Sequence, residues 1–161
     1  MNIYFSGSVA GGRQKQAEYE ELIAFCKTYG KVLTENVWDE VVKEDVNVYV
    51  RDTSWLDTAD VLIAEISVPT LGVGMELEHA VNKKVPVLCL YDMCLTKPVS
   101  KMVISCPSIT SIGYATIEDA KKVIEQLKEH FVDVEIELLE LGAAFVTQGG
   151  PKCIAIQYIE K

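Results

Sequence analysis

The chain has 161 residues, 49% of them hydrophobic and 24% charged, and this balance is typical of one globular domain with a real core. The formal net charge of −9 argues against broad contact with a nucleic-acid polymer or an anionic membrane. Backbone N–H groups can still bind a single phosphate at this net charge. The apolar runs are too short to span a bilayer, so we expect no membrane association.

The N-terminal residues and the cysteines indicate a compartment. Residues 1–5 lack the basic start of a signal peptide and continue directly into a strand-like run. The five cysteines are widely spaced, with no CxxC pair and no Cys/His cluster, which favours reduced thiols and gives no metal-binding pattern. We therefore expect a protein that is cytoplasmic, with the nucleus as an additional location, and that needs no metal.

Strands and helices alternate along the chain. In order, the predicted elements are a strand over 2–6, a glycine-rich turn over 7–12, a helix over 13–29, a strand over 31–34, a loop over 35–45, a helix over 46–58, a strand over 60–66, a helix over 74–83, strands over 85–91 and 110–114, and a helix over 116–131. This alternation predicts an α/β fold, a Rossmann-like (flavodoxin-like) five-stranded parallel sheet with helices on both faces.

Particular residues sharpen this prediction. In the helix over 46–58, we expect Val50, Trp55 and Leu56 to lie in the core. Thr116 is the expected N-cap of the last helix, with Asp119 three residues further on. The strand over 60–66 is nearly all apolar, as expected of a strand buried on both faces.

The C-terminal segment differs from the rest. Residues 132–137 alternate apolar and acidic side chains, residues 153–159 also have the composition of a strand, and 149–151 has the composition of a turn. We therefore expect an α/β core over 1–131 and a C-terminal β-rich extension of the same domain over 132–161.

Four features lie at the edge where open α/β sheets bind ligands. The loop over 7–13 is rich in glycine and opens a helix, so its N–H groups can face an anion, although it matches neither a P-loop nor GxGxxG. Glu76 stands just behind two glycines at the apparent start of a helix. Asp52 belongs to an earlier predicted helix, and Tyr4 to the first predicted strand.

Each feature alone also has a purely structural explanation. A glycine loop can be a tight turn without a ligand, and Glu76 can simply complement the dipole of its helix. Asp52 can be a solvated side chain, and Tyr4 can belong to the core. Taken together, however, two carboxylates can cleave a bond to an anomeric carbon, one as nucleophile and the other assisting the leaving base or the water.

The histidines do not suggest a competing chemistry. His79 follows Glu76 on the same predicted helix, where we expect it to pack, and His130 is expected to be a surface cation at a helix end. The sequence has no Ser-His-Asp order and no Cys-His pair.

The chain resembles the nucleoside 2-deoxyribosyltransferase superfamily over about residues 2–131. The segments that carry the resemblance are Ile3–Ser8, Gly11–Arg13, Gly30–Glu35, Asp52 with Trp55 and Leu56, Ala59–Val61, Ala64 and Glu65, Leu71–Gly74 with Glu76 and Leu77, Val87–Leu90, and Ser100 with Met102. Spread over so many segments, the resemblance is more specific than any single motif.

The resemblance implies a role for each matching residue. Glu76 matches the nucleophile, Asp52 the residue that assists departure of the base, and Tyr4 the residue that orients the nucleophile. The implied phosphate-binding residues are Gly7, Ser8, Val9, Ala10, Gly11, Gly12, Arg13, Thr70, Ser100, Lys101 and Met102. Tyr19 and Asn36 match positions on the base side. Ser100 matches a serine that reaches the phosphate of a neighbouring subunit, which implies a homodimer with a shared active site.

The hydroxyls of Ser8, Thr70 and Ser100 suit a phosphate and favour the branch of the superfamily that acts on nucleotides. The resemblance then implies hydrolysis of the N-glycosidic bond of 2'-deoxynucleoside 5'-monophosphates through a glycosyl-Glu intermediate, without a cofactor. Two alternatives stay open: a nucleoside 2-deoxyribosyltransferase that exchanges bases, and a nucleotide-binding sensor without turnover. Three positions depart from the family pattern and bear on base preference and phosphate affinity: Ala10 for an arginine, Asn36 for a histidine and Met75 for a tyrosine.

Overall fold

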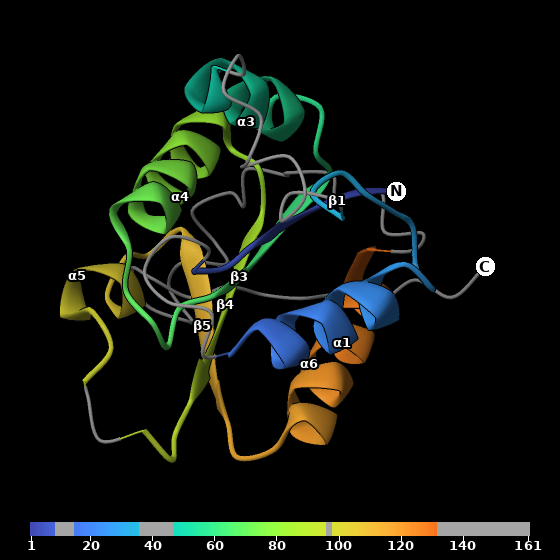
Figure 1. Ribbon diagram of the computed structural model, residues 1–161, viewed down its shortest axis with the longest axis vertical. Coiled ribbons are helices and arrows are strands. Elements are labelled where there is room, and N and C mark those ends of the chain that lie inside the picture. The colour runs from blue at the N-terminus through green and yellow to red at the C-terminus, as the bar shows by residue number, and fades with distance from the viewer. Residues whose placement is uncertain (9–14, 36–46, 96–97, 132–161) are drawn as a thin grey trace, which may run out of the picture. The chain divides into compact units, whose positions relative to one another are not determined.

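A computed structural model describes residues 1–8, 15–35, 47–95 and 98–131. The chain divides between His130 and Phe131 into two units, and the description below concerns the first. The predicted β-rich extension over 132–161 lies outside the described residues and stays a prediction, as does most of the loop predicted over 35–45. Element labels follow Figure 1.

Five parallel strands form one sheet. They are β1 (Asn2–Ser6), β2 (Lys31–Val32), β3 (Val61–Glu65), β4 (Val87–Asp92) and β5 (Ile109–Tyr114), in the order β2-β1-β3-β4-β5. This is the flavodoxin-like order, in which the chain reverses its direction of winding between β1 and β3. The predicted fold class is confirmed. Strand β2, predicted over 31–34, covers only Lys31–Val32.

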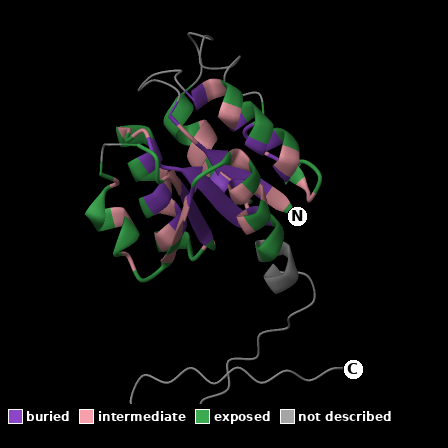
Figure 2. Cartoon of the chain, turned by 90° about the horizontal axis from the view of Figure 1, so that it is seen from below, coloured by how far each residue is buried: buried purple, intermediate pink, exposed green. Residues whose placement is uncertain are grey.

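Helices cover both faces of the sheet (Figure 1). They are α1 (Gln16–Cys26), α3 (Val48–Leu56), α4 (Leu71–Lys83), α5 (Lys101–Ile104) and α6 (Ile117–Phe131). Helices α1 and α6 contribute to one buried cluster, and α3 and α4 contribute to the other. Figure 2 shows the strands as a buried layer between these partly exposed helices, as expected of a doubly wound fold.

Strand β1 shows how the sheet divides its side chains between the two faces. Ile3 and Phe5 belong to the cluster under α1 and α6, whereas Tyr4 belongs to the cluster under α3 and α4. Successive strand residues point to opposite faces, so Ser6 shares the face of Tyr4. Both hydroxyls are therefore turned toward α4.

Helix α4 begins earlier than predicted, at Leu71 rather than Gly74. Thr70 is its N-cap, because its Oγ1 accepts a hydrogen bond from the Val73 N–H at 3.3 Å. Gly72 and Gly74 thus lie inside the first turns of the helix and not in a turn before it. The sequence misled because glycine is a poor helix former, and the cap outweighs that preference here.

Helix α3 corrects a second prediction. Leu56 is fully buried and Trp55 packs partly against the core, as expected, but Val50 is 54% exposed. Six residues of helix place Val50 roughly 120° around the axis from Leu56, so it leaves the face that meets the sheet. The predicted cap of α6 is confirmed, since Thr116 Oγ1 accepts from the Asp119 N–H at 3.2 Å.

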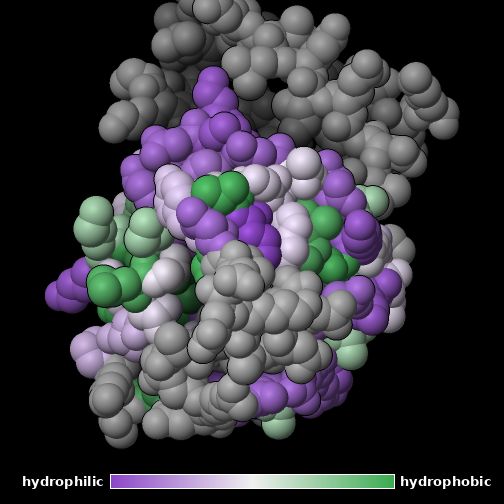
Figure 3. Space-filling view, turned by 45° about the horizontal axis from the view of Figure 1, so that its top comes forward, coloured by the Kyte–Doolittle hydropathy of each residue, from purple (hydrophilic) through white to green (hydrophobic). Residues whose placement is uncertain are grey.

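The surface has no single dominant apolar patch where Figure 3 displays the described residues. Hydrophobic side chains there form separate groups among hydrophilic ones. Among the described helices, none has both the length and the apolar character that a membrane span requires. The four described cysteines (Cys26, Cys89, Cys94 and Cys106) are all free thiols.

Candidate active site

Glu76 is held by two hydroxyls from one strand. The Tyr4 hydroxyl donates to Glu76 Oε1 at 2.9 Å, and the Ser6 hydroxyl donates to Glu76 Oε2 in a short contact. Glu76 lies in the second turn of α4, and both donors lie on β1, next to the point where the sheet reverses its winding. This is the place where open α/β sheets bind ligands, and each carboxylate oxygen there has one donor.

The surroundings of Glu76 act on its charge in opposite directions. Burial raises the pKa of Glu76 above its ordinary value, and the charge of Asp52 raises it further. The hydrogen bonds from Ser6 and Tyr4 and the charge of Arg51 lower that pKa, but burial dominates. Burial beside these carboxylates also raises the pKa of Tyr4, so its phenol stays protonated and remains a donor.

Asp52 comes to the site on α3 with a cation beside it. Arg51 Nε lies 2.7 Å from Asp52 Oδ1, and the Arg51 guanidinium lies 4.8 Å from the centre of the Trp55 ring. Both charged side chains are mostly buried. The ion pair and the ring fix where these groups stand, and both their charges act on Glu76.

The predicted phosphate-binding residues are only partly described. Ser8 is fully buried, and its hydroxyl has no hydrogen-bond partner among the described residues. Gly7 approaches Tyr19 so closely that an added Cβ would lie 3.1 Å from the Tyr19 ring. The other predicted loop positions lie outside the described residues: Val9, Ala10, Gly11, Gly12 and Arg13. The base-side position Asn36 also lies outside them.

The remaining predicted phosphate residues lie at helix starts. Thr70 is half-buried and its hydroxyl caps α4, although a hydroxyl that accepts one bond can still donate another. Ser100 and Lys101 are exposed at the start of α5, and Met102 is 84% exposed. These three residues are thus accessible to another molecule.

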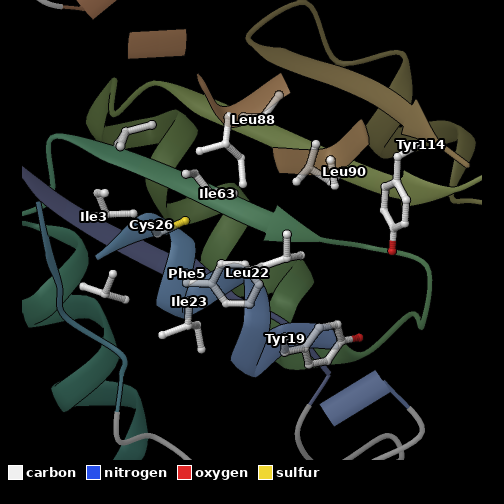
Figure 4. Close-up of a cluster of buried hydrophobic side chains, with 14 residues drawn as sticks. Ile3, Phe5, Tyr19, Leu22, Ile23, Cys26, Ile63, Leu88, Leu90 and Tyr114 are labelled. Atoms are coloured by element: carbon white, nitrogen blue, oxygen red, sulfur yellow. The ribbon is translucent and has the colours of Figure 1, made fainter. Parts of the chain in front are cut away.

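Tyr19 lies on the opposite face of the sheet from Glu76. It is fully buried in the cluster under α1 and α6, and its hydroxyl donates to Glu65 Oε2 at 3.0 Å. Figure 4 shows Tyr19 and Tyr114 at the same end of this cluster. The structure therefore does not bring Tyr19 to Glu76, and its role on the base side stays a prediction.

A buried polar network that the sequence did not predict surrounds Tyr19. Glu65 also accepts from Tyr114 at 2.9 Å and from Ser67, and burial raises the pKa of Glu65. Lys15 Nζ lies 2.9 Å from Asp92 Oδ2 and 3.2 Å from the Tyr114 hydroxyl. The network joins residues from the ends of three strands and from the start of α1. It therefore links these elements to one another at the edge of the sheet where the site lies.

Known families show where this arrangement belongs. The family model of nucleoside 2-deoxyribosyltransferase matches residues 3–126. The chain belongs to this family. The match covers the residues that hydrogen-bond to Glu76, Tyr4 and Ser6, and the resemblance predicted from the sequence is confirmed.

Relatives within the family carry names of one kind of enzyme. The chain is 42% identical over 110 residues to the mouse 5-hydroxymethyl-dUMP N-hydrolase, a stretch of 63% of this chain and 64% of that protein. It is 34% identical over 139 residues to the Tetraodon nigroviridis 5-hydroxymethyl-dUMP N-hydrolase, covering 81% of this chain and 96% of that protein. A Syntrophotalea carbinolica protein, provisionally named 2'-deoxynucleoside 5'-phosphate N-hydrolase 1, is 37% identical over 131 residues, or 78% of this chain and 92% of its own.

A solved structure supports the fold. The Clostridium botulinum CMP N-glycosidase BcmB superposes with a TM-score of 0.56 at 15% identity, covering 78% of this chain and 99% of that one. At this identity the similarity concerns the fold alone.

The structure brings together Glu76, Asp52 and Tyr4, as the sequence predicted. It also places Ser6 and Arg51 near Glu76, and the sequence analysis had assigned neither of them to the site. A signal for Ser6 was present, because it stands two residues after Tyr4 on a strand and so shares its face. Arg51 had only its position next to Asp52 as a signal. His79, which the sequence predicted to pack, makes a polar contact with Asp57 Oδ1 at 2.8 Å.

Proposed function

We propose that this chain hydrolyses the N-glycosidic bond of 2'-deoxynucleoside 5'-monophosphates, releasing a free base and 2-deoxyribose 5-phosphate. The observation that carries the proposal is the partly buried carboxylate of Glu76, which two hydroxyls orient beside a second acidic residue, Asp52. The names of the relatives support the substrate class, since they describe N-hydrolases of deoxynucleotides.

The proposed reaction has two steps. A Glu76 oxygen bonds to C1' of the sugar while the bond from C1' to the base nitrogen breaks, and the electron pair of that bond leaves with the base. Asp52 assists the departure of the base by transferring a proton to it. A water then attacks C1', the bond to Glu76 breaks, and the carboxylate is restored while Asp52 takes the proton of the water. Only side chains and water take part.

We expect recognition of the 5'-phosphate to make the site selective for nucleotides over nucleosides. The buried Ser8 hydroxyl lacks a partner among the described residues, and a bound phosphate would supply one. The Thr70 hydroxyl and the first N–H groups of α4 offer further donors next to Glu76. We include the loop over 9–13 in this site on the resemblance stated above.

A homodimer completes the proposed site. Ser100, Lys101 and Met102 are exposed at the start of α5, where a second copy can present them to a neighbouring phosphate. Exposed apolar side chains on nearby elements supply surface that such a contact would bury: Leu71 and Met75 on α4, and Met102 and Ile104 on α5.

Chromatography of released base tests the proposed reaction. The purified chain is incubated with dGMP or with deoxyguanosine, each with and without excess adenine. We expect guanine from dGMP, little guanine from deoxyguanosine, and no adenine-containing product. Formation of deoxyadenosine from deoxyguanosine would instead establish base transfer, and thermal stabilisation by dGMP without any product would establish a sensor.

A further inference from the structure

The two donors to Glu76 differ in kind. Tyr4 reaches Oε1 with a phenol at the end of a long rigid side chain, whereas Ser6 reaches Oε2 with a hydroxyl next to the backbone of β1. Ser6 is only 2% exposed, and no other described donor contacts Oε2. Removal of the Ser6 hydroxyl would therefore leave that oxygen, on a partly buried side chain, without a described donor.

One donor alone does not define the plane of a carboxylate. A carboxylate held only at Oε1 can still pivot about that oxygen through the torsions of its side chain, which moves Oε2 through an arc. A second donor at Oε2 removes that freedom, and both donors share one strand, so their separation is set by the backbone of β1. Alignment of a nucleophile in this way contributes directly to rate.

We propose that Ser6 is a second positioning residue for Glu76. Its hydroxyl, bound to Oε2 while Tyr4 is bound to Oε1, fixes the plane of the carboxylate and favours its charged form. The inference rests on the proposed function, since it assigns Ser6 a part in the same site. Groups that face Glu76 from neighbouring elements are Tyr4 on β1 and Asp52 and Arg51 on α3, and a substitution at Ser6 removes none of them.

The test compares Ser6→Ala with Ser6→Thr, which keeps the hydroxyl. Because a hydrogen bond to a charged group is lost, we expect Ser6→Ala to lower kcat about 10- to 100-fold with little change in KM. The acidic limb of the pH profile of kcat/KM should move to higher pH, since the lost donor favoured the carboxylate. Ser6→Thr should restore much of both. Ser6→Cys, a weaker donor of similar size, should move the limb in the same direction as Ser6→Ala.

Ser111→Ala is the matched control. Ser111 lies on β5 opposite Cys89, and its buried hydroxyl has no partner among the described residues. The control removes a strand hydroxyl from the same sheet without touching Glu76, so kcat and the acidic limb should stay at wild-type values.

An NMR titration separates this inference from the proposed function. With ¹³C-labelled glutamate, the Glu76 carboxyl signal is assigned by its loss in Glu76→Gln, and its pKa is read in the unliganded protein. We expect a higher pKa in Ser6→Ala than in wild type. An unchanged titration together with an unchanged acidic limb overturns the role of Ser6. Absence of base release from any deoxynucleotide by wild type overturns the proposed function, while the titration still judges Ser6.

Discussion

The Tyr4 hydroxyl lies 2.9 Å from Glu76 Oε1, and this contact joins the first strand of the sheet to the helix that follows the third strand. β1 and β3 are neighbours in the sheet although α1, β2 and α3 separate them in sequence. The pair therefore exists only because the chain winds in the flavodoxin-like order, which brings both residues to the switch point.

Loss of the proposed nucleophile should abolish turnover without unfolding the protein. We expect Glu76→Gln to lower kcat/KM for dGMP by at least about 10³-fold, because the amide cannot form the glycosyl intermediate. Base release is measured by chromatography, and binding of dGMP by calorimetry. Near-normal turnover in this variant would refute the assignment of Glu76 as nucleophile, and retained binding shows that the site is still formed.

The same variant should change stability in a pH-dependent way. The folded pKa of Glu76 is raised, so the folded state holds its proton more tightly than the unfolded chain does. Stability from this group is fully present below the unfolded pKa and is lost as pH rises through the folded pKa. Glu76→Gln should therefore be more stable than wild type at pH 7 and should lose less stability between pH 5 and pH 7, as measured by urea unfolding. A variant that is less stable at pH 7 would contradict the burial argument.

Asp52→Asn should reveal whether Asp52 assists departure of the base. We expect a fall in kcat of about 10²- to 10⁴-fold for dGMP, the usual size of general acid catalysis. N7-methylated dGMP carries a base that leaves without protonation, so the loss should be much smaller with that substrate. Equal losses with the two substrates would show that Asp52 acts elsewhere. Asp57→Asn, at the C-cap of the same helix and paired with His79 and Lys83, is the control and should leave both rates unchanged.

Mixed dimers should test the shared site. In the proposed homodimer, each site takes Glu76 from one subunit and Ser100 from the other. Glu76→Gln should be inactive and Ser100→Ala weakened, but a heterodimer of the two contains one site with both native residues. After unfolding and refolding an equal mixture, we expect activity to reach about a quarter of the wild-type value per subunit. If the mixture is no more active than Ser100→Ala alone at half the total concentration, each site is formed within a single subunit.

The glycines of α4 should trade stability against function. An added Cβ at Gly74 meets no described atom within 4 Å, and alanine favours a helix by about 0.5–1 kcal/mol over glycine. Gly74→Ala should therefore raise the melting temperature, while KM for dGMP rises if the ligand or a second copy approaches this surface. Gly30→Ala is the contrast, because its Cβ would lie 2.2 Å from the Met1 carbonyl oxygen and should destabilise the fold. Unchanged KM in Gly74→Ala would leave the glycine without a role in binding.

Local patterns in the sequence determined much of the architecture. The apolar run in β3 and the cap at Thr116 each depend on residues close together in the chain, and both were predicted correctly. The regular alternation of strand and helix then implied a parallel sheet. The sequence pattern placed Glu76, Asp52 and Tyr4 at one edge of the sheet, the family resemblance implied their roles, and the structure brings these residues together.

Only the tertiary structure decided which residues meet across these elements. The order of the strands, the contact of Ser6 with Glu76, and the network of Lys15 with Asp92 join residues distant in sequence, and no local pattern encodes them. The exposure of Val50 has the same origin, since a helix can present several apolar faces and packing against its neighbours selects one. Local sequence thus determined the elements, whereas long-range packing decided the partners of the candidate nucleophile and burial raises its pKa.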